Sequence, residues 1–294
     1  MYEPDVSIIT PTFNVVENNQ NDDFLLQIAL LDKQTYPNIE HIIIDNASKD
    51  GTDELLKEYK NSGYISFLSE PDRGKFDAMN KGILRAKGKY VAFLSCDDCY
   101  HDIKAIEDII LKMESENADY CLYKTYCVMP DRTAFEYQPS IHNIFQVPPC
   151  ARQAIIFNRK TLQEIGGFDT KFSLIADYDL ILRLVLARKK GIQVDRNLLT
   201  YNLGMKVAQY SIQSNAECSH IFYKNYKQLY PITQEQIDRI VTIGEIPETL
   251  LNKFATYFPN DEVKTFFQKC ITMSNIRKES YETQRLNERQ QRNL

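Results

Sequence analysis

The chain of 294 residues lacks any apolar run near the roughly 18 residues that are needed to span a bilayer. Its first residues, Met1 to Asp5, are acidic where a secretory signal would be basic and then apolar. We therefore expect a cytoplasmic protein. A peripheral position at the inner face of the membrane stays open.

Dense basic clusters are also missing from the first 200 residues, and the formal net charge is −5. Nucleic acid is therefore not expected as the main partner, because phosphate backbones are bound by basic surfaces. The seven cysteines are odd in number and scattered, which is typical of reduced thiols rather than of a disulfide framework. Cys96 and Cys99 form one C-x-x-C, but no second such motif accompanies it, so a zinc or redox site is not favoured.

Two phosphate-binding motifs are absent as well. The sequence has neither a G-x-G-x-x-G dinucleotide motif nor a G-x-x-x-x-G-K-[ST] P-loop. If the protein binds phosphate groups, another device must neutralise them. A carboxylate pair that holds Mg²⁺ or Mn²⁺ against a diphosphate is one such device.

Short apolar runs alternate with amphipathic stretches over the first two thirds of the chain. Strands are predicted over 6–10, 40–45, 64–68, 90–94, 120–126 and 154–157, with helices between them and a buried helix from Asp177. This order predicts an α/β fold with a mostly parallel sheet flanked by helices. Beyond about residue 205 only helical patterns persist. We therefore expect a domain over 1–204 and a C-terminal helical extension over 205–294, whose last 18 residues form a polar tail.

Polar residues follow four of the predicted strands. They are Pro11-Thr12-Phe13-Asn14, Asp45, Glu70-Pro71-Asp72 and Asp97-Asp98. Each alone is compatible with a helix cap or a turn, but together they define the carboxyl edge of the sheet, where open α/β folds bind ligands. The adjacent pair Asp97-Asp98 suits a hard divalent cation.

A second acidic group, Asp177 and Asp179, begins the buried helix. One interpretation is a cap with a first-turn acid, which the helix dipole favours. The other is a general base that accepts a proton from an attacking hydroxyl. The spacing alone leaves both open.

Three long motifs in this order resemble those of the family 2 inverting glycosyltransferases with the GT-A fold, in particular the branch that builds bacterial surface polysaccharides. They are Asp45-Asn46-Ala47-Ser48-Lys49-Asp50-Gly51-Thr52, the segment from Ser69 to Gly82, and Gly167-Phe168-Asp169 followed by Ala176-Asp177-Tyr178-Asp179-Leu180. The resemblance covers about residues 5 to 200. It implies a Rossmann-like nucleotide-diphospho-sugar transferase fold and a nucleotide-sugar donor.

The resemblance also implies roles for single residues. Pro11, Thr12 and Phe13 would line the base pocket, and Asp45 would contact uracil or ribose. The diphosphate and sugar would be bordered by Asp72, Lys75 and Asp77. Asp97 would lie near the ribose, and Asp98 would be the main metal ligand with Asp97 beside it. Asp177 would be the catalytic base, and Asp179 would support its loop or contact a phosphate or the acceptor.

Two departures from the family pattern stand out. Relatives often carry His-Gln where this chain has Arg152-Gln153, so Arg152 either contacts a phosphate or acceptor or is a surface residue. A Gly-Gly-x-Ser element of relatives is replaced by the stretch from Asn202 to Val207, in which Lys206 is a candidate cation.

We therefore expect an inverting transferase that moves a sugar from a nucleotide-diphosphate donor, a UDP-sugar, to a hydroxyl of a glycan or lipid-linked acceptor. A sugar-phosphate nucleotidyltransferase and a non-catalytic nucleotide-sugar binding subunit are the alternatives. The aromatic stretch from His220 to Tyr230 either packs on its own domain, which we favour, or rests on a membrane or partner.

Overall fold

The computed structural model describes residues 4–145, 148–203, 211–258 and 261–292. The chain divides into two compact units. The first combines Met1–Pro139 with Cys150–Gln209, and the second combines Ser140–Pro149 with Tyr210–Leu294. The expected domain boundary between residues 204 and 205 lies outside the described residues.

A nine-stranded sheet forms the centre of the first unit, in the order β3-β2-β1-β4-β8-β6-β9-β5 with β7 paired to β6. The strands are β1 Val6–Thr12, β2 Ile39–Asp45, β3 Ser66–Ser69, β4 Tyr90–Phe93, β5 Cys99–Tyr100, β6 Tyr120–Val128, β7 Ala134–Tyr137, β8 Ile155–Asn158 and β9 Gly191–Asn202. The first four are mutually parallel. The expected parallel sheet therefore describes one half of a mixed sheet, because β8 runs antiparallel to both β4 and β6.

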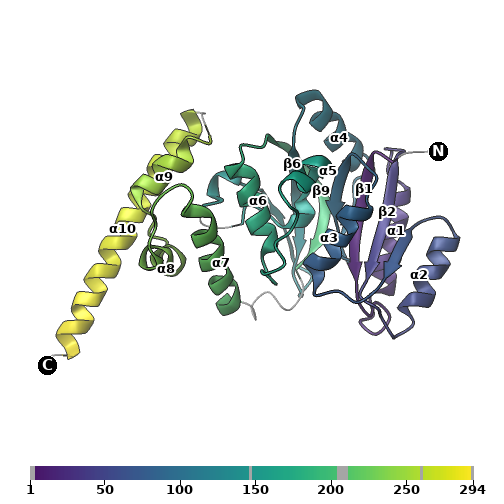
Figure 1. The fold of residues 1–294 in the computed structure, drawn as a ribbon, viewed down its shortest axis with the longest axis horizontal. Coiled ribbons are helices and arrows are strands. Elements are labelled where there is room, and N and C mark those ends of the chain that lie inside the picture. The colour runs from purple at the N-terminus through teal and green to yellow at the C-terminus, as the bar shows by residue number, and fades with distance from the viewer. Residues whose placement is uncertain (1–3, 146–147, 204–210, 259–260, 293–294) are drawn as a thin grey trace. The chain divides into compact units, whose positions relative to one another are not determined.

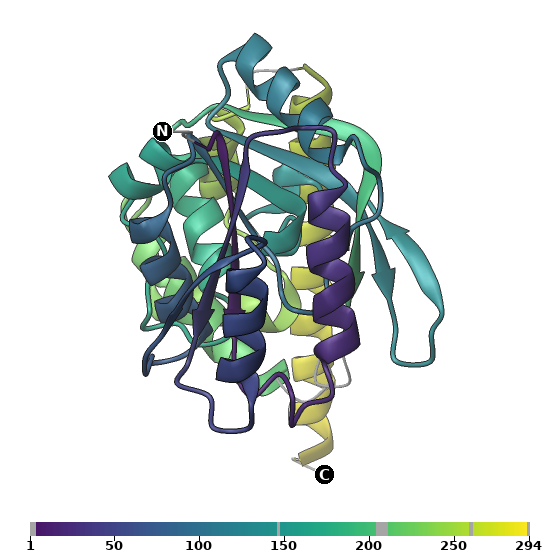
Figure 2. The same ribbon diagram turned by 90° about the vertical axis from the view of Figure 1, so that its right-hand side faces the viewer.

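Helices cover both faces of this sheet (Figures 1 and 2). They are α1 Asn21–Asp32, α2 Thr52–Asn61, α3 Lys75–Arg85, α4 Ala105–Glu116, α5 Arg159–Glu164 and α6 Ala176–Leu186, with the 3₁₀ turn η2 Arg152–Ala154 before β8. Apolar side chains of β1 and β4 that alternate along the strands meet α1 and α4 on one face. The opposite face meets α3, where a Cβ on Gly82 would come within 2.4 Å of Ile9. Gly82 thus lets α3 lie close against β1.

Aromatic rings fill the core under α3. Phe76 of α3 and Phe93 of β4 both pack on Phe168, with ring centroids 5.2 and 5.1 Å apart, and Phe93 also meets Phe157 of β8. Burying such rings contributes several kcal/mol each by about 25 cal/mol per Å² of apolar area. The core therefore fixes the start of α3 and the segment before α6, which both carry predicted site residues.

The second unit is helical, as expected. It contains η1 Ile141–Asn143, α7 Ser211–Tyr226, α8 Gln234–Ile243, α9 Glu248–Ala255 and α10 Asp261–Arg292. The aromatic stretch expected to pack on its own domain does so, because Phe222 and Tyr226 are buried and stack with centroids 4.9 Å apart. No helix in the described part of the chain is both long and apolar enough to cross a bilayer.

Candidate active site

The four polar signals predicted at strand ends do lie at one edge of the sheet. Thr12 ends β1, Asp45 ends β2, Glu70 follows β3, and Asp97 and Asp98 follow β4 by a few residues. The parallel register aligns Thr12 with Asp45 and Asp45 with Ser69. The four signals therefore lie at one edge, as expected, and their part in ligand binding stays a prediction.

Asp45 is fully buried and binds three loops together. Its carboxylate accepts hydrogen bonds from Thr12 Oγ1 at 3.1 Å, from Ser69 Oγ at 2.6 Å and from both the amide and the hydroxyl of Ser48, at 3.0 and 2.6 Å. Four donors match the lone pairs of a carboxylate. Asp45 in this structure organises the ends of β1, β2 and β3. The contact with uracil or ribose stays a prediction, and it would require one of these bonds to be exchanged.

The Asp97-Asp98 pair sits in a polar network of its own. The Oδ2 atom of Asp98 accepts from the Ser95 amide at 2.8 Å and from Gln153 Nε2 at 2.9 Å, while Oδ1 accepts from the Asn202 amide at 3.3 Å. Burial, followed by the charge of Asp97, raises the pKa of Asp98 to about 7. Burial also raises the pKa of Asp97 above its ordinary value. Both carboxylates thus sit where a nearby positive charge would stabilise their ionised form.

Arg152 connects this pair to the predicted base. Its Nη2 donates to Ser95 Oγ at 3.1 Å, and its Nη1 lies 3.9 Å from Asp177 Oδ2. The side chains of Arg152 and Asp177 are only 11% and 17% exposed, so this ion pair is screened far less than one on the surface. Of the two interpretations of Arg152, a plain surface residue is therefore wrong. The fold brings Asp177, which lies in the first turn of α6, to the same edge as Asp98.

The segment from Asp72 to Asp77 covers the end of the turn after β3 and the first residues of α3. Asp72 caps it by accepting from the Gly74 amide at 2.8 Å, and burial raises the pKa of Asp72. Asp77 accepts from the amide and the side chain of Arg73, and the hydrogen bond from that side chain is the main factor that lowers the pKa of Asp77. Lys75 donates to the Leu174 carbonyl at 3.2 Å, just before α6. Lys75 thus lies between the predicted diphosphate segment and the helix that carries Asp177.

Asp179 and Asn80 hold the approach to α6. Asp179 is fully buried and accepts from Arg183 Nε at 2.7 Å, while the two Nη atoms of Arg183 donate to the carbonyls of Ile165 and Gly167. Asn80 exchanges two hydrogen bonds of 2.9 Å with the backbone of Phe168. This geometry supports the expected supporting role of Asp179, while a contact between Asp179 and a phosphate or acceptor finds no support in it.

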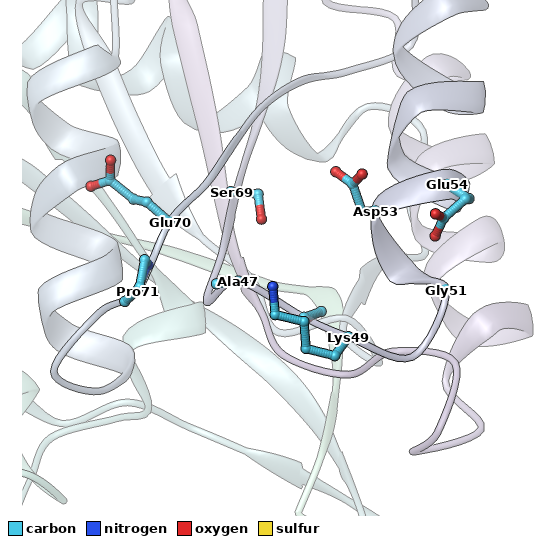
Figure 3. A pocket seen from close by; sticks show the side chains of 9 residues that line it. Ala47, Lys49, Gly51, Asp53, Glu54, Ser69, Glu70 and Pro71 are labelled. Atoms are coloured by element: carbon cyan, nitrogen blue, oxygen red, sulfur yellow. The ribbon is translucent and has the colours of Figure 1, made fainter.

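The predicted base-binding residues differ in accessibility. Pro11 and Thr12 belong to β1, and Thr12 is buried, whereas the ring of Phe13 is 54% exposed. Beside them opens a polar cleft of about 770 Å³, which contains Ala47, Ser48, Lys49, Gly51, Asp53, Glu54, Ser69, Glu70 and Pro71. Figure 3 shows Ser69 and Lys49 between Asp53 and Glu54 on one side and Glu70 and Pro71 on the other. Ser48 and Ser69 line this cleft and also bind Asp45, so the cleft lies over the buried aspartate.

The donor set at Asp97 and Asp98 fits a divalent cation that takes few protein ligands. Among the described residues, no three His, Cys, Asp or Glu side chains gather into a group that could hold a metal by itself. Mg²⁺ is commonly bound by one or two carboxylates, with phosphate and water oxygens completing the shell. The Oδ1 atom of Asp98 receives one long hydrogen bond from the described residues, which leaves a lone pair for such an ion.

Several site residues were not predicted from the sequence. Asn202, at the end of β9, donates to Asp98 and to the carbonyl of Asp97, and Gln27 of α1 donates to the carbonyls of Ser95 and Asp98. Gln153 links Ser95 to Asp98. Asn202 begins the stretch that replaces the Gly-Gly-x-Ser element, but its contact with Asp98 was not expected because the strand that ends at Asn202 was not predicted. Lys206 lies outside the described residues.

The structure is an α/β fold whose carboxyl edge gathers buried and half-buried aspartates, at the edge where open α/β folds bind ligands. The model for glycosyl transferase family 2 matches residues 7–174, which is more than half of the chain. This chain belongs to glycosyl transferase family 2.

Similar sequences agree with this assignment. An uncharacterized glycosyltransferase of Rickettsia prowazekii is 31% identical over 216 residues, which are 68% of this chain and 64% of that protein. TuaG of Bacillus subtilis, a putative teichuronic acid biosynthesis glycosyltransferase, is 34% identical over 116 residues, or 38% of this chain and 44% of its own. The chain thus spans less than two thirds of the length of either relative.

Solved structures share the fold. S. aureus TarS 1–349 in complex with UDP-GlcNAc superimposes with a TM-score of 0.61 at 14% identity, over 95% of this chain and 91% of that one. The mannosyltransferase PcManGT of Pyrobaculum calidifontis, in complex with GDP-Man and Mn²⁺, gives 0.60 at 16% identity, over 94% and 86%. At these identities the likeness concerns the fold alone, and it confirms the GT-A class.

Proposed function

We propose that this glycosyltransferase moves a sugar from a UDP-sugar to a hydroxyl of a glycan or lipid-linked acceptor, with inversion at the anomeric carbon, in surface polysaccharide synthesis. The observation that carries the proposal is that Arg152 lies 3.9 Å from Asp177 and also donates to Ser95, whose amide binds Asp98. Inversion needs the leaving group and the base on opposite sides of one carbon, and in this proposal the Asp97-Asp98 pair serves the leaving group while Asp177 serves the acceptor. TarS and TuaG support a nucleotide-sugar donor and a cell-surface product by analogy.

Each residue has a task in this proposal. Phe13 offers an exposed ring on which the base stacks, next to Pro11 and Thr12. Asp97 and Asp98 would hold Mn²⁺ or Mg²⁺, and such an ion, when bound, neutralises the charge that develops on the departing diphosphate. Asp177 accepts the proton of the acceptor hydroxyl.

The segment from Asp72 to Asp77 would border the diphosphate and the sugar. Its Lys75 is already directed toward Leu174, close to the start of α6. A lipid-linked acceptor would require a peripheral contact with the membrane. We propose this contact only for the case in which the acceptor is lipid-linked.

A panel of nucleotide sugars with and without Mn²⁺, monitored by thermal shift, tests the donor because a true ligand raises the melting temperature by mass action. Transfer or slow donor hydrolysis is then measured for the wild type, for Asp177→Asn and for the control Asp131→Asn in the β6–β7 turn. We expect Asp177→Asn to lose activity about 100- to 10,000-fold, the range of a general base, while UDP binding is retained. Full activity of Asp177→Asn would contradict the proposal.

The same experiment separates the alternatives. A binding subunit would show the thermal shift but no hydrolysis in the wild type. A nucleotidyltransferase would release pyrophosphate from a nucleoside triphosphate and a sugar phosphate. The family assignment does not favour that reaction.

A further inference from the structure

Arg152 has more hydrogen-bonding capacity than the structure uses. A guanidinium has five N–H donors. Within the described residues, Arg152 makes one hydrogen bond, to Ser95, and its buried Nε has no partner. At 3.9 Å the contact with Asp177 is an ion pair rather than a hydrogen bond. A buried cation with unused donors is expected at a site that binds an anion, because the anion would supply the missing acceptors.

The surroundings of Arg152 define the chemistry of that anion. A planar guanidinium binds phosphate and carboxylate oxygens through two parallel hydrogen bonds, which an ammonium group cannot do. Ser95, which anchors one end of the guanidinium, also binds Asp98 through its amide, so Arg152 lies next to the proposed metal pair. The anion that we expect between Asp98 and Arg152 is the diphosphate of the donor, whose charge a cation held by Asp97 and Asp98 would offset.

We propose that Arg152 is a diphosphate clamp that controls whether Asp177 is available as a base. When the donor is absent, Arg152 pairs with Asp177. When the diphosphate binds the guanidinium, the carboxylate of Asp177 is released. The inference rests on the proposed function. It makes donor binding a condition for an available base.

In the transfer step, each bond that forms is matched by a bond that breaks. The acceptor oxygen forms a bond to the anomeric carbon while its proton passes to Asp177 Oδ2. The bond from the anomeric carbon to the diphosphate oxygen breaks, and the nucleoside diphosphate leaves with the electron pair. The Arg152 guanidinium neutralises part of the charge on this leaving group.

Competition between Asp177 and the diphosphate for one guanidinium gives a distinctive test. Inorganic pyrophosphate and UDP are titrated calorimetrically, in EDTA and again with Mg²⁺, into the wild type, Arg152→Gln, Arg152→Lys and Asp177→Asn. Arg132→Gln in the exposed β6–β7 turn is the charge-matched control. We expect Arg152→Gln to bind both anions about 10- to 100-fold more weakly, and Arg152→Lys to recover only part of this loss.

Asp177→Asn should bind pyrophosphate several-fold more tightly than the wild type, because no carboxylate then competes for the guanidinium. The clamp predicts that this gain disappears when Asp177→Asn is combined with Arg152→Gln, whereas the loss of a nearby negative charge alone would raise the affinity equally in both backgrounds. Unchanged pyrophosphate affinity in Asp177→Asn, or an equal gain in both backgrounds, overturns the clamp. Arg152→Lys, which preserves the charge, keeps the test valid if Arg152→Gln does not fold. Pyrophosphate binding that follows this pattern in a protein that hydrolyses no nucleotide sugar would support the clamp and contradict the proposed function.

Discussion

The aspartates that the sequence predicts as site residues differ in their burial and in their hydrogen bonds. Asp45, Asp98 and Asp179 are fully buried, with their oxygens bound by protein donors, whereas Asp177 keeps part of its carboxylate accessible. A buried charge must be satisfied by hydrogen bonds. A buried aspartate at a strand end therefore holds the surrounding loops in place through the donors that it binds. Residue type and spacing carry no information about burial, so the sequence could find the site but could not divide these tasks among its residues.

His41 provides a pH test at the scale of one side chain. It is fully buried in β2, its Nε2 lies 2.9 Å from Thr10 Oγ1, and burial lowers its pKa from 6.5 to about 3. Below pH 6.5 the unfolded chain therefore binds a proton that the folded protein does not bind, so the folded state loses stability as the pH falls toward 3. The expected slope is about 1.4 kcal/mol per pH unit for this one proton.

Urea unfolding between pH 7 and pH 4 measures this contribution. We expect the free energy of unfolding of His41→Gln to depend less steeply on pH than that of the wild type. The difference corresponds to the one proton that His41 binds on unfolding. His101→Gln, at an exposed histidine, is the matched control and should follow the wild type. Parallel curves for the wild type and His41→Gln would show that His41 is protonated in the folded protein.

At the scale of elements, the ends of β1, β2 and β3 depend on one carboxylate. Replacing Asp45 by Asn removes an acceptor atom and directs an amide N–H toward donors from Thr12, Ser48 and Ser69. Unsatisfied buried donors cost about 1 to 3 kcal/mol each, so we expect Asp45→Asn to lower the free energy of unfolding by about 2 to 4 kcal/mol. Asp53→Asn, at a partly exposed residue of α2 that pairs with Lys57, should change it by less than about 1 kcal/mol. Equal losses in the two variants would contradict the role of Asp45.

A strand that was not predicted, β9, explains why the contact of Asn202 with Asp98 was not expected from the sequence. The apolar residues Ile192, Val194, Leu198 and Leu199 of β9 are interrupted by the charged pair Asp195-Arg196, and the pairing of β9 with β6 shifts register near Tyr123 and Lys124. Such an irregularity breaks the period of two on which strand prediction depends. The four parallel strands are rich in apolar residues, contain no adjacent pair of charges, and were all predicted. Asn202 reaches Asp98 only because β9 exists.

At the scale of the whole molecule, the chain enters the second unit twice. The short segment Ser140–Pro149 belongs with Tyr210–Leu294, although it lies between two stretches of the first unit. Its composition does not differ from that of its neighbours, so a single boundary was the natural prediction from the sequence. The contacts that place it are tertiary. Phe145 is fully buried, with its ring 5.3 Å from Phe267 and 6.0 Å from Phe254.

Phe145 therefore tests whether this segment stabilises the helical unit. Truncating a buried phenylalanine to alanine removes its apolar contacts and leaves a cavity, at a cost of about 3 to 5 kcal/mol. We expect Phe145→Ala to lose hydrogen-exchange protection in peptides from α7, α9 and α10, while peptides from β1 to β4 keep theirs, because separate units can unfold separately. Phe135→Ala, at a ring of β7 that is 47% exposed, is the control and should leave both sets of peptides unchanged. Loss of protection across β1 to β4 in Phe145→Ala would mean that the segment stabilises the first unit and that the two units unfold together.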